Sequence, residues 1–252
     1  MCGRTRKLCR SHIFSQFLHE RNYDETGTAM SISSNLRHSP RRVQTGWWEH
    51  LLCEECETRI SKLEAYGRKF LDRTLAIDVP PHSDATEIQV ITVRYDYRRF
   101  KLFALSLLWR AHVAKSELFR KFSIGPLAED VRRMLLAEDA GPRHQCPFLV
   151  VRLDGAPTAS TAISTPQVHK VDGIRMAQFY AYGFWWVCFT TRDIRRGHVN
   201  RVPFGDLIAM SRPGNRLLVP VISTTERQFQ SIIAGWINEE VLRKARESHR
   251  TK

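Results

Sequence analysis

Apolar residues recur at helical spacing in several segments of the chain. Residues 54–71 place apolar side chains between alternating charges, which predicts a helix that begins at or just after Cys56. Residues 99–122 carry an apolar side along their whole length and predict a long helix, and residues 127–136 predict a shorter one. Residues 227–246 predict a closing amphipathic helix with basic residues in its last turns.

Strand patterns begin at residue 87 and continue through the second half of the chain. Residues 87–95 alternate and are rich in β-branched side chains. Further short aromatic or β-branched runs, separated by Gly, Pro, Asp and Asn, cover residues 148–153, 176–190, 201–210 and 216–223. Together these patterns predict an α+β fold with an antiparallel sheet and flanking helices.

The first fifty residues differ from the rest of the chain. They are rich in Arg, His, Ser and Thr and show few regular apolar patterns, so something other than a core is expected to order them. Residues 78–84 (DVPPHSD) combine two prolines with polar residues and read as a linker. We therefore expect a small module in residues 1–76 and a larger α+β domain in residues 77–252.

The charge of the chain indicates a class of partner. Among 252 residues, 39 Lys and Arg face 26 Asp and Glu, giving a formal net charge of +13. This balance favours a polyanionic partner, although a merely soluble basic protein has the same composition. No apolar stretch approaches the roughly 20 residues that cross a bilayer, and the N-terminus lacks the apolar region of a secretory signal. We expect a cytoplasmic protein with no membrane association.

Four of the six cysteines precede residue 57. Without an export signal, metal ligands or buried thiols are expected rather than disulfides. Cys53 and Cys56 form a CxxC pair, whose spacing lets two thiolates share one zinc ion; a buried or redox-active thiol pair is the alternative. A structural zinc needs four ligands, and the remaining candidates in this half are Cys2, Cys9, His12 and His50. Cys146 and Cys188 lie in apolar company and read as small buried hydrophobes.

The segments LCRSHIF and LLCEECETRISK resemble the HNH, or ββα-metal, zinc-finger nuclease family. The closest similarity is to uncharacterised bacterial proteins that start CxLCG, continue to a SHIIP segment and carry LLCxxCE before a helix. The resemblance covers residues 2–70 and implies an HNH-like module with structural Zn²⁺. The first CxxC pair of these proteins, within CxLCG, corresponds here to MCG, so Cys2 takes the place of the second cysteine of that pair. Cys2, Cys53 and Cys56 are then the expected ligands, with Cys9 or His12 completing the set.

The same resemblance implies a catalytic role for His12. In the family this histidine is the general base that activates water against a phosphodiester, while a divalent ion, Mg²⁺ or Mn²⁺, stabilises the developing charge. A zinc ligand or a packed structural histidine are the alternatives for His12. Ser11 replaces the metal-binding acidic residue that precedes this histidine in the family. Glu57 replaces the Asn or His that follows the second CxxC pair in the family. Glu57 is an acceptable oxygen ligand, and it is also an ordinary carboxylate for the first turn of a helix.

Basic and aromatic residues surround the proposed zinc site in the sequence. The expected nucleic-acid contacts are Arg10, Arg37, Arg41, Arg42 and Lys62. A solvated charged loop is the alternative for the arginines. Trp47 and Trp48 either stack on an unpaired base or form the small core that a stapled module needs.

The leading hypothesis from the sequence is a metal-dependent endonuclease of HNH-like type that acts on nucleic acid, with DNA the expected substrate. The alternative is a non-catalytic, zinc-stabilised nucleic-acid-binding protein, and a third is a module that binds an acidic protein. The chain has no GxSxG elbow, P-loop or GxGxxG motif, so acyl transfer and nucleotide-driven chemistry are not expected.

Overall fold

The computed structural model describes residues 1–31, 41–80, 88–171, 174–190 and 215–234. Its helices are α1 (Gln16–Glu20), α2 (Glu54–Leu75), α3 (Tyr97–Val113), α4 (Leu127–Ala137), α5 (Pro157–Thr161) and α8 (Glu226–Ala234). Its strands are β1 (Cys9–His12), β2 (Ala29–Ser31), β3 (Arg41–Val43), β4 (Trp48–Leu52), β5 (Gln89–Arg94), β6 (Phe148–Asp154), β7 (Gln167–Val171), β8 (Ile174–Ala181), β9 (Phe184–Phe189) and β10 (Arg216–Ser223). The α+β class expected from the sequence is confirmed.

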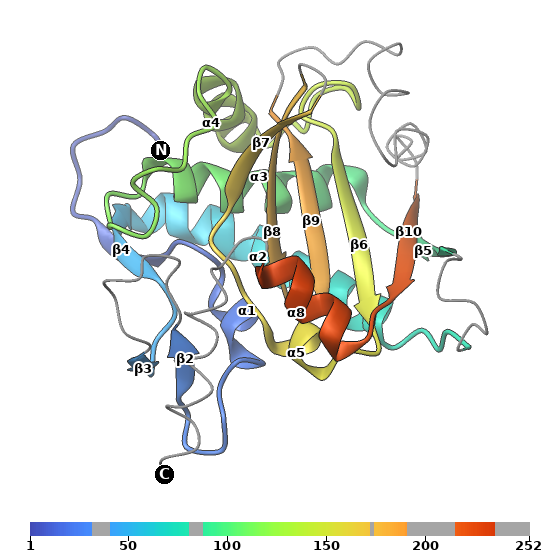
Figure 1. The fold of residues 1–252 in the computed structure, drawn as a ribbon. Helices are drawn as coiled ribbons and strands as arrows, with labels where there is room; N and C mark the ends of the chain where they lie inside the picture. Colours follow the sequence, from blue (N-terminus) through green and yellow to red (C-terminus); the bar gives the residue numbers. More distant parts are fainter. Residues whose placement is uncertain (32–40, 81–87, 172–173, 191–214, 235–252) are drawn as a thin grey trace.

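Six strands form one sheet in the order β5-β10-β6-β9-β8-β7 (Figure 1). The sheet is mixed, because β10 pairs with β6 in parallel while every other neighbouring pair is antiparallel. The expectation of a purely antiparallel sheet was therefore wrong for this pair. In the sheet β6 lies between β9 and β10, and both β6 and β10 run opposite to β9. Local apolar patterns do not encode this strand order.

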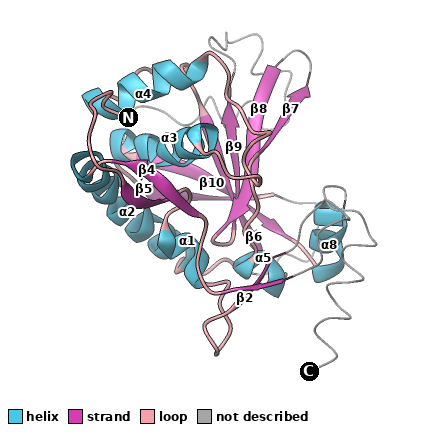
Figure 2. Ribbon diagram, turned by 90° about the vertical axis from the view of Figure 1, so that its left-hand side faces the viewer, coloured by secondary structure: helices cyan, strands magenta, loops and turns pink. Residues whose placement is uncertain are grey.

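Helices cover both faces of this sheet. In Figures 1 and 2, α2 and α3 lie against one face, and α5 and α8 lie against the other. Strand β9, with the sequence FWWVCF, is therefore buried on both of its faces. Phe184, Trp186 and Cys188 belong to the larger buried cluster on the α2 and α3 side, whereas Val187 and Phe189 belong to the smaller cluster on the α8 side. A strand buried on both faces reads as a continuous apolar run.

The run 176–190 is a hairpin of β8 and β9 rather than a single strand. Its turn consists of Tyr182 and Gly183, which both have positive φ, at 61° and 79°. Two consecutive residues with positive φ match the type I′ turn, whose twist suits a tight hairpin. The sequence YG is a weaker turn signal than Asn-Gly, and apolar residues flank it on both sides. The turn was therefore not recognised within the apolar run. Residues 201–210 and most of the predicted closing helix lie outside the described residues.

Helix α3 ends nine residues before the predicted end of its segment. Asp96 caps its start by accepting a hydrogen bond from the backbone N–H of Arg99 at 3.0 Å. At the other end, the carboxylate of Glu49 accepts hydrogen bonds from the backbone N–H groups of Lys115 and Ser116 at 2.6–3.0 Å. These two amides therefore bond a side chain of β4 in place of helical carbonyls, and the helix stops at Val113.

The first 76 residues share a buried core with the rest of the chain. The ring of Phe14 lies 4.8 Å from that of Phe179, and the ring of Phe17 lies 5.9 Å from that of Phe103. The hydroxyl of Tyr182 donates to Asp72 at 2.6 Å. The larger buried cluster thus contains residues from both sides of position 76. The boundary placed there stays a prediction, as does zinc stapling of the first module.

Among the described residues, no helix is both long enough and apolar enough to cross a membrane.

Candidate metal centre and the polar network beside it

A strand ribbon and a helix position the CxxC pair. β1 and β4 pair antiparallel, and β4 leads directly into α2. Cys53 is the residue that caps the start of α2, and Cys56 lies in its first turn together with Glu54, Glu55 and Glu57. Acidic side chains stabilise the positive end of a helix, which explains why α2 begins here. Both thiols of the pair are buried.

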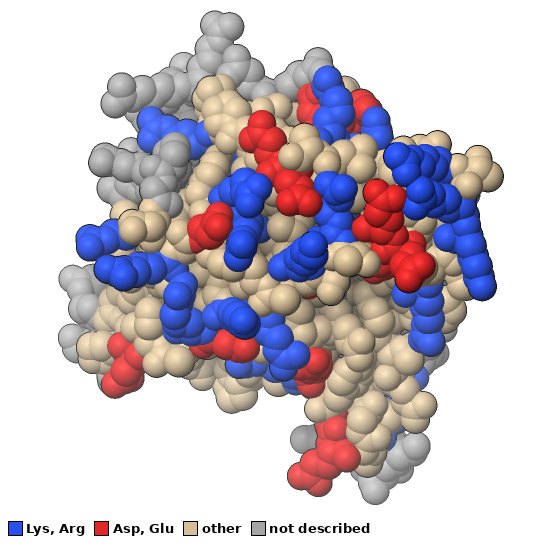
Figure 3. Space-filling model, turned by 180° about the vertical axis from the view of Figure 1, so that it is seen from behind, with Lys and Arg blue, Asp and Glu red and all other residues tan. Residues whose placement is uncertain are grey.

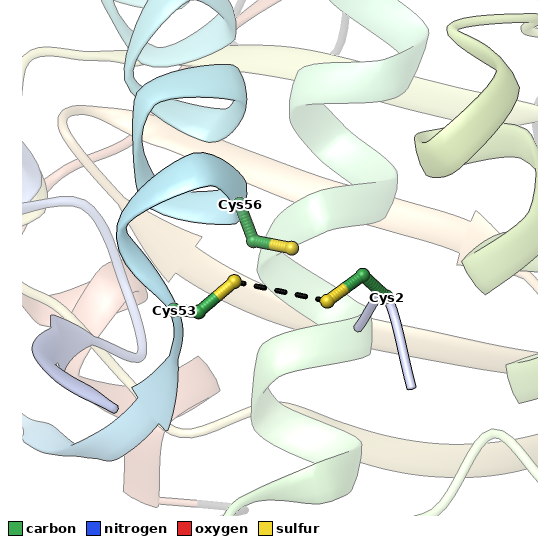
Figure 4. A group of neighbouring side chains, drawn as sticks. All are labelled: Cys2, Cys53 and Cys56. Carbon is green, nitrogen blue, oxygen red and sulfur yellow. Dashed lines mark hydrogen bonds between the residues drawn. The ribbon is translucent and has the colours of Figure 1, made fainter. Parts of the chain in front are cut away.

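The thiol of Cys2 joins this pair from the N-terminal arm. The three sulfur atoms of Cys2, Cys53 and Cys56 lie within 4.8 Å of one another, and those of Cys2 and Cys53 are 3.7 Å apart (Figure 4). This separation is far longer than the ~2.05 Å of a disulfide. It matches the spacing of about 3.8 Å that follows for two sulfurs bound to one tetrahedral zinc at Zn–S distances of ~2.3 Å. The donor set therefore fits zinc.

Contacts to two helices hold the arm that carries Cys2. The guanidinium of Arg6 donates to Glu55 of α2 at 2.8 Å, and that of Arg132 in α4 donates to the backbone carbonyl of Met1 at 2.8 Å. The arm thus crosses the start of α2 and brings the third sulfur to the pair. These contacts join residues 49 and 131 positions apart, so sequence spacing alone does not reveal them.

The thiols of this group differ in acidity. The backbone N–H of Arg4 lowers the pKa of Cys2 to about 7. Burial raises the pKa of Cys56 to about 11. Thiolates are the metal-binding form of cysteine, so Zn²⁺ binding would release protons from this group and its affinity would rise with pH. Cys9 lies in β1 opposite Leu52, and its sulfur is not one of the three.

His12 ends strand β1 and lies directly opposite Trp48 of β4. Its imidazole is half-buried, and burial lowers the pKa of His12 below the ordinary value, with the nearby carboxylate of Glu64 acting in the opposite direction. Burial therefore favours the neutral imidazole, which is the protonation state that a general base needs. The structure thus places His12 at the end of β1 away from the Cys9–Leu52 pair, and it is not part of the thiol group.

A buried arginine lies beside His12. Arg110 of α3 is 1% exposed; its guanidinium donates to the backbone carbonyl of His12 at 2.6 Å and pairs with the carboxylate of Glu64 in α2 at 2.7 Å. Ser15 donates to the same carboxylate at 2.7 Å. This network ties β1, α2 and α3 together. Sequence analysis missed it, and the one available signal was an arginine inside the apolar segment of α3.

Glu57 lies on the same side of α2 as Glu64, seven positions away. Burial raises the pKa of Glu57, and the Ser11 hydroxyl offsets part of this effect. One carboxylate oxygen of Glu57 is buried without a hydrogen-bond partner. Within the described ranges, the cysteine group is the only set of three or more His, Cys, Asp or Glu ligand atoms that lie within 4.8 Å of one another. Neither His12 nor Glu57 belongs to it, so a Mg²⁺ or Mn²⁺ site at these residues stays a prediction.

The expected basic contacts are dispersed. Arg10 and Lys62 are exposed on β1 and α2. Arg42 of β3 is exposed as well, and its guanidinium lies 3.8 Å from the carboxylate of Asp24. Arg37 lies outside the described residues, and for Arg41 only the backbone in β3 is described.

Acidic side chains interrupt the positive surface. On the face shown in Figure 3, Lys and Arg spread widely with Asp and Glu between them. Near the thiols, Glu55 lies 2.8 Å from Arg6 and 3.6 Å from Arg4. The dense positive surface that the sequence indicated beside the metal centre is thus partly neutralised.

The two adjacent tryptophans have different environments. Trp47 packs edge-on against Phe14 and Phe119, with ring centroids 5.8 and 5.4 Å apart. Trp48 is 39% exposed, and the guanidinium of Arg10 lies 4.0 Å from the centre of its ring. Trp47 is thus partly buried and packs against the core, whereas Trp48 is exposed to solvent. Stacking of Trp48 on a base stays a prediction.

No protein-family model, curated protein or solved structure matches this chain, so its assignment rests on the residues and geometry described above.

Proposed function

We propose that this chain is a zinc-stapled nucleic-acid-binding protein. The observation that carries the proposal is the convergence of the Cys2, Cys53 and Cys56 sulfurs at the junction of the β1–β4 ribbon and α2. A ribbon, a helix and thiols at their junction agree with the HNH-like resemblance of residues 2–70. The net charge of +13 supports a polyanionic partner.

Zn²⁺ at this centre would be structural. Cys2, Cys53 and Cys56 would hold it, and when bound it would add to the free energy of folding by tying the N-terminal arm to α2. Three cysteines leave one position of a tetrahedron for water or a fourth side chain. This role needs only residues that already lie together.

A nuclease is the second candidate function, and His12 favours it. Burial favours the neutral form of the imidazole, which lies on the ribbon face that also carries Arg10 and Trp48. In this reading His12 would take a proton from water, and a bound divalent ion would stabilise the negative charge that develops on the phosphate. We rank it second because hydrolysis needs a second metal site, whereas binding does not.

One set of measurements tests both candidates. Zinc content of the purified protein is determined by mass spectrometry for the wild type, a Cys53→Ser, Cys56→Ser double variant and Cys9→Ser. We expect one zinc per chain in the wild type, loss in the double variant, and a lower unfolding midpoint after chelation. Retention in Cys9→Ser would show that this thiol is not a ligand. A wild type without zinc would contradict the stapled centre.

Nucleic-acid binding is measured separately on the same protein. In a mobility assay at 50 and 200 mM salt, we expect binding that weakens steeply as salt rises, because phosphate contacts release counterions. Plasmid incubated with Mg²⁺ or Mn²⁺ then distinguishes the candidates. Cleavage by the wild type that is lost in His12→Ala, with binding retained, would establish the nuclease. No binding to any DNA or RNA would overturn the proposed function.

A further inference from the structure

The outward face of the β1–β4 ribbon carries a group of residues that zinc binding leaves unused. Arg10 lies opposite His50, and His12 lies opposite Trp48. Side chains of directly opposed residues, and of residues two positions apart on one strand, lie on the same face of a sheet. Arg10, His12, Trp48 and His50 therefore share one face, which we call the ribbon platform.

The platform is built around one indole ring. Trp48 is 39% exposed, with the Arg10 guanidinium 4.0 Å from its centre and the His50 ring at 6.0 Å and nearly perpendicular. A single exposed tryptophan is unremarkable on a protein surface. Here it is combined with a cation and a second aromatic ring, and Arg10 and His50 are exposed as well.

The charge of the platform is one-sided. Glu49 is the only acidic residue in β1 and β4. It faces away from the platform, and its carboxylate is bound by the backbone N–H groups of Lys115 and Ser116. Among the described residues, no carboxylate forms an ion pair with Arg10. The platform thus presents aromatic surface beside an unneutralised cation.

We infer that the ribbon platform binds single-stranded nucleic acid, with an unpaired base stacked on Trp48 and Arg10. This inference rests on the proposed nucleic-acid binding and narrows it to unpaired strands. An indole and a guanidinium plane offer stacking surfaces that any base can use, and Arg10 adds a charge for the phosphate. In a duplex the faces of the bases are already stacked, so a flat platform has no access to them.

The test compares single strands with a duplex. Fluorescence anisotropy at 100 mM salt measures the affinity of the full chain for labelled 12-nucleotide dT and U oligonucleotides and for a 12-base-pair DNA duplex. We expect the wild type to bind the single strands more tightly than the duplex. Binding of dT alone or U alone would identify the source of the strand; binding of both would show recognition of the shared base and phosphate chemistry.

Variants then locate the contact. We expect Trp48→Ala to weaken single-strand binding about 10- to 100-fold with little effect on the duplex, and Trp48→Phe to restore part of the loss. Arg10→Gln should weaken binding and reduce the salt slope by about 0.7, the value for one phosphate contact on a single strand. Lys69→Ala, which removes an exposed cation from α2, is the matched control.

Each outcome has a distinct meaning. An unchanged affinity in Trp48→Ala, or an equal loss for single strands and duplex, would overturn the platform while leaving nucleic-acid binding intact. A wild type that binds none of the probes would remove the proposed function and the inference with it. Unfolding midpoints within about 2 °C of the wild type are expected for these exposed positions, which separates loss of contact from loss of folding.

Discussion

Helix α3 buries two cationic side chains, Lys101 and Arg110, and both form hydrogen bonds with nearby acceptors. The ammonium of Lys101 donates to the hydroxyl of Tyr97 and to the carbonyls of Pro142 and Gln145 at 2.6–3.0 Å. Burial lowers the pKa of Lys101 to about 8. Arg110 pairs with Glu64 as described above. A buried cation is tolerated when each donor meets an acceptor. Both residues can therefore lie in the apolar sequence of α3 while the helix stays buried.

The pH dependence of stability is expected to reflect His19. This side chain is 5% exposed and packs edge-on against Trp47, and burial lowers the pKa of His19 to about 4. The unfolded chain, with a histidine pKa near 6.5, binds more protons than the folded chain between pH 6.5 and pH 4. The free energy of unfolding should therefore fall as the pH drops through this window, by ~3 kcal/mol in total.

Urea unfolding at several pH values between 7 and 4 measures this effect. His19→Gln removes the titrating group, so the variant should lose less stability than the wild type over the same window. His144→Gln changes an exposed histidine and should leave the wild-type slope unchanged. An identical pH dependence in wild type and His19→Gln would exclude His19 as the cause.

At the scale of elements, α2 makes a close contact with α3 through a glycine. The helix buries Ile60, Leu63, Phe70 and Leu71 on one side, as the apolar spacing predicted, whereas Ala65 of the same pattern is exposed. Gly67 lies on the same side, where a Cβ atom would come within 2.5 Å of the Phe103 ring of α3. The absence of a side chain therefore lets the two helices approach, and this contact outweighs the low helix propensity of glycine.

Replacing Gly67 by alanine tests that contact. Alanine gains about 1 kcal/mol in helix propensity, but forcing a methyl group against a buried ring costs about 1–3 kcal/mol. The rigid ring of Phe103 is itself fully buried, so we expect a net loss of stability in thermal or urea unfolding. Lys69→Ala in the same helix should change stability by less than about 0.5 kcal/mol. A Gly67→Ala protein as stable as the wild type would show that the ring moves aside freely.

At the scale of the whole molecule, the aromatic contacts of Phe14 and Phe17 cross the expected domain boundary. Their partners Phe103, Phe179 and Tyr182 all follow residue 77. A fragment of residues 1–76 would expose these rings and the buried face of α2 to water. The proposed zinc site also lies within this fragment, but its three thiols lie at one end of α2 only.

We therefore expect residues 1–76, expressed alone with Zn²⁺, to lack a fixed tertiary structure. The measurement is a two-dimensional NMR spectrum of the fragment beside that of the full chain, and poor dispersion is the expected result because the core partners are missing. A well-dispersed fragment spectrum would instead establish an independent zinc module and support the boundary near residue 76.

Local patterns in the sequence were sufficient for part of this structure. The helices at 54–71 and 127–136 and the strands at 87–95, 148–153 and 216–223 were predicted because their periodicity comes from neighbouring residues. The short strands and helix of the first fifty residues were not predicted, because their apolar periods are too brief to recognise. The proximity of Cys53 and Cys56 followed from the CxxC spacing.

Tertiary structure decided the rest, because the relevant partners are far apart in the chain. The third sulfur, from Cys2, reaches the pair only through an arm held by α2 and α4. The end of α3 depends on Glu49. Trp47, just before β4, packs against the core, whereas Trp48 lies on the exposed face of β4. The sequence thus determined which residues could bind a metal or a base, and packing between distant segments determined which of them lie where such binding is geometrically feasible.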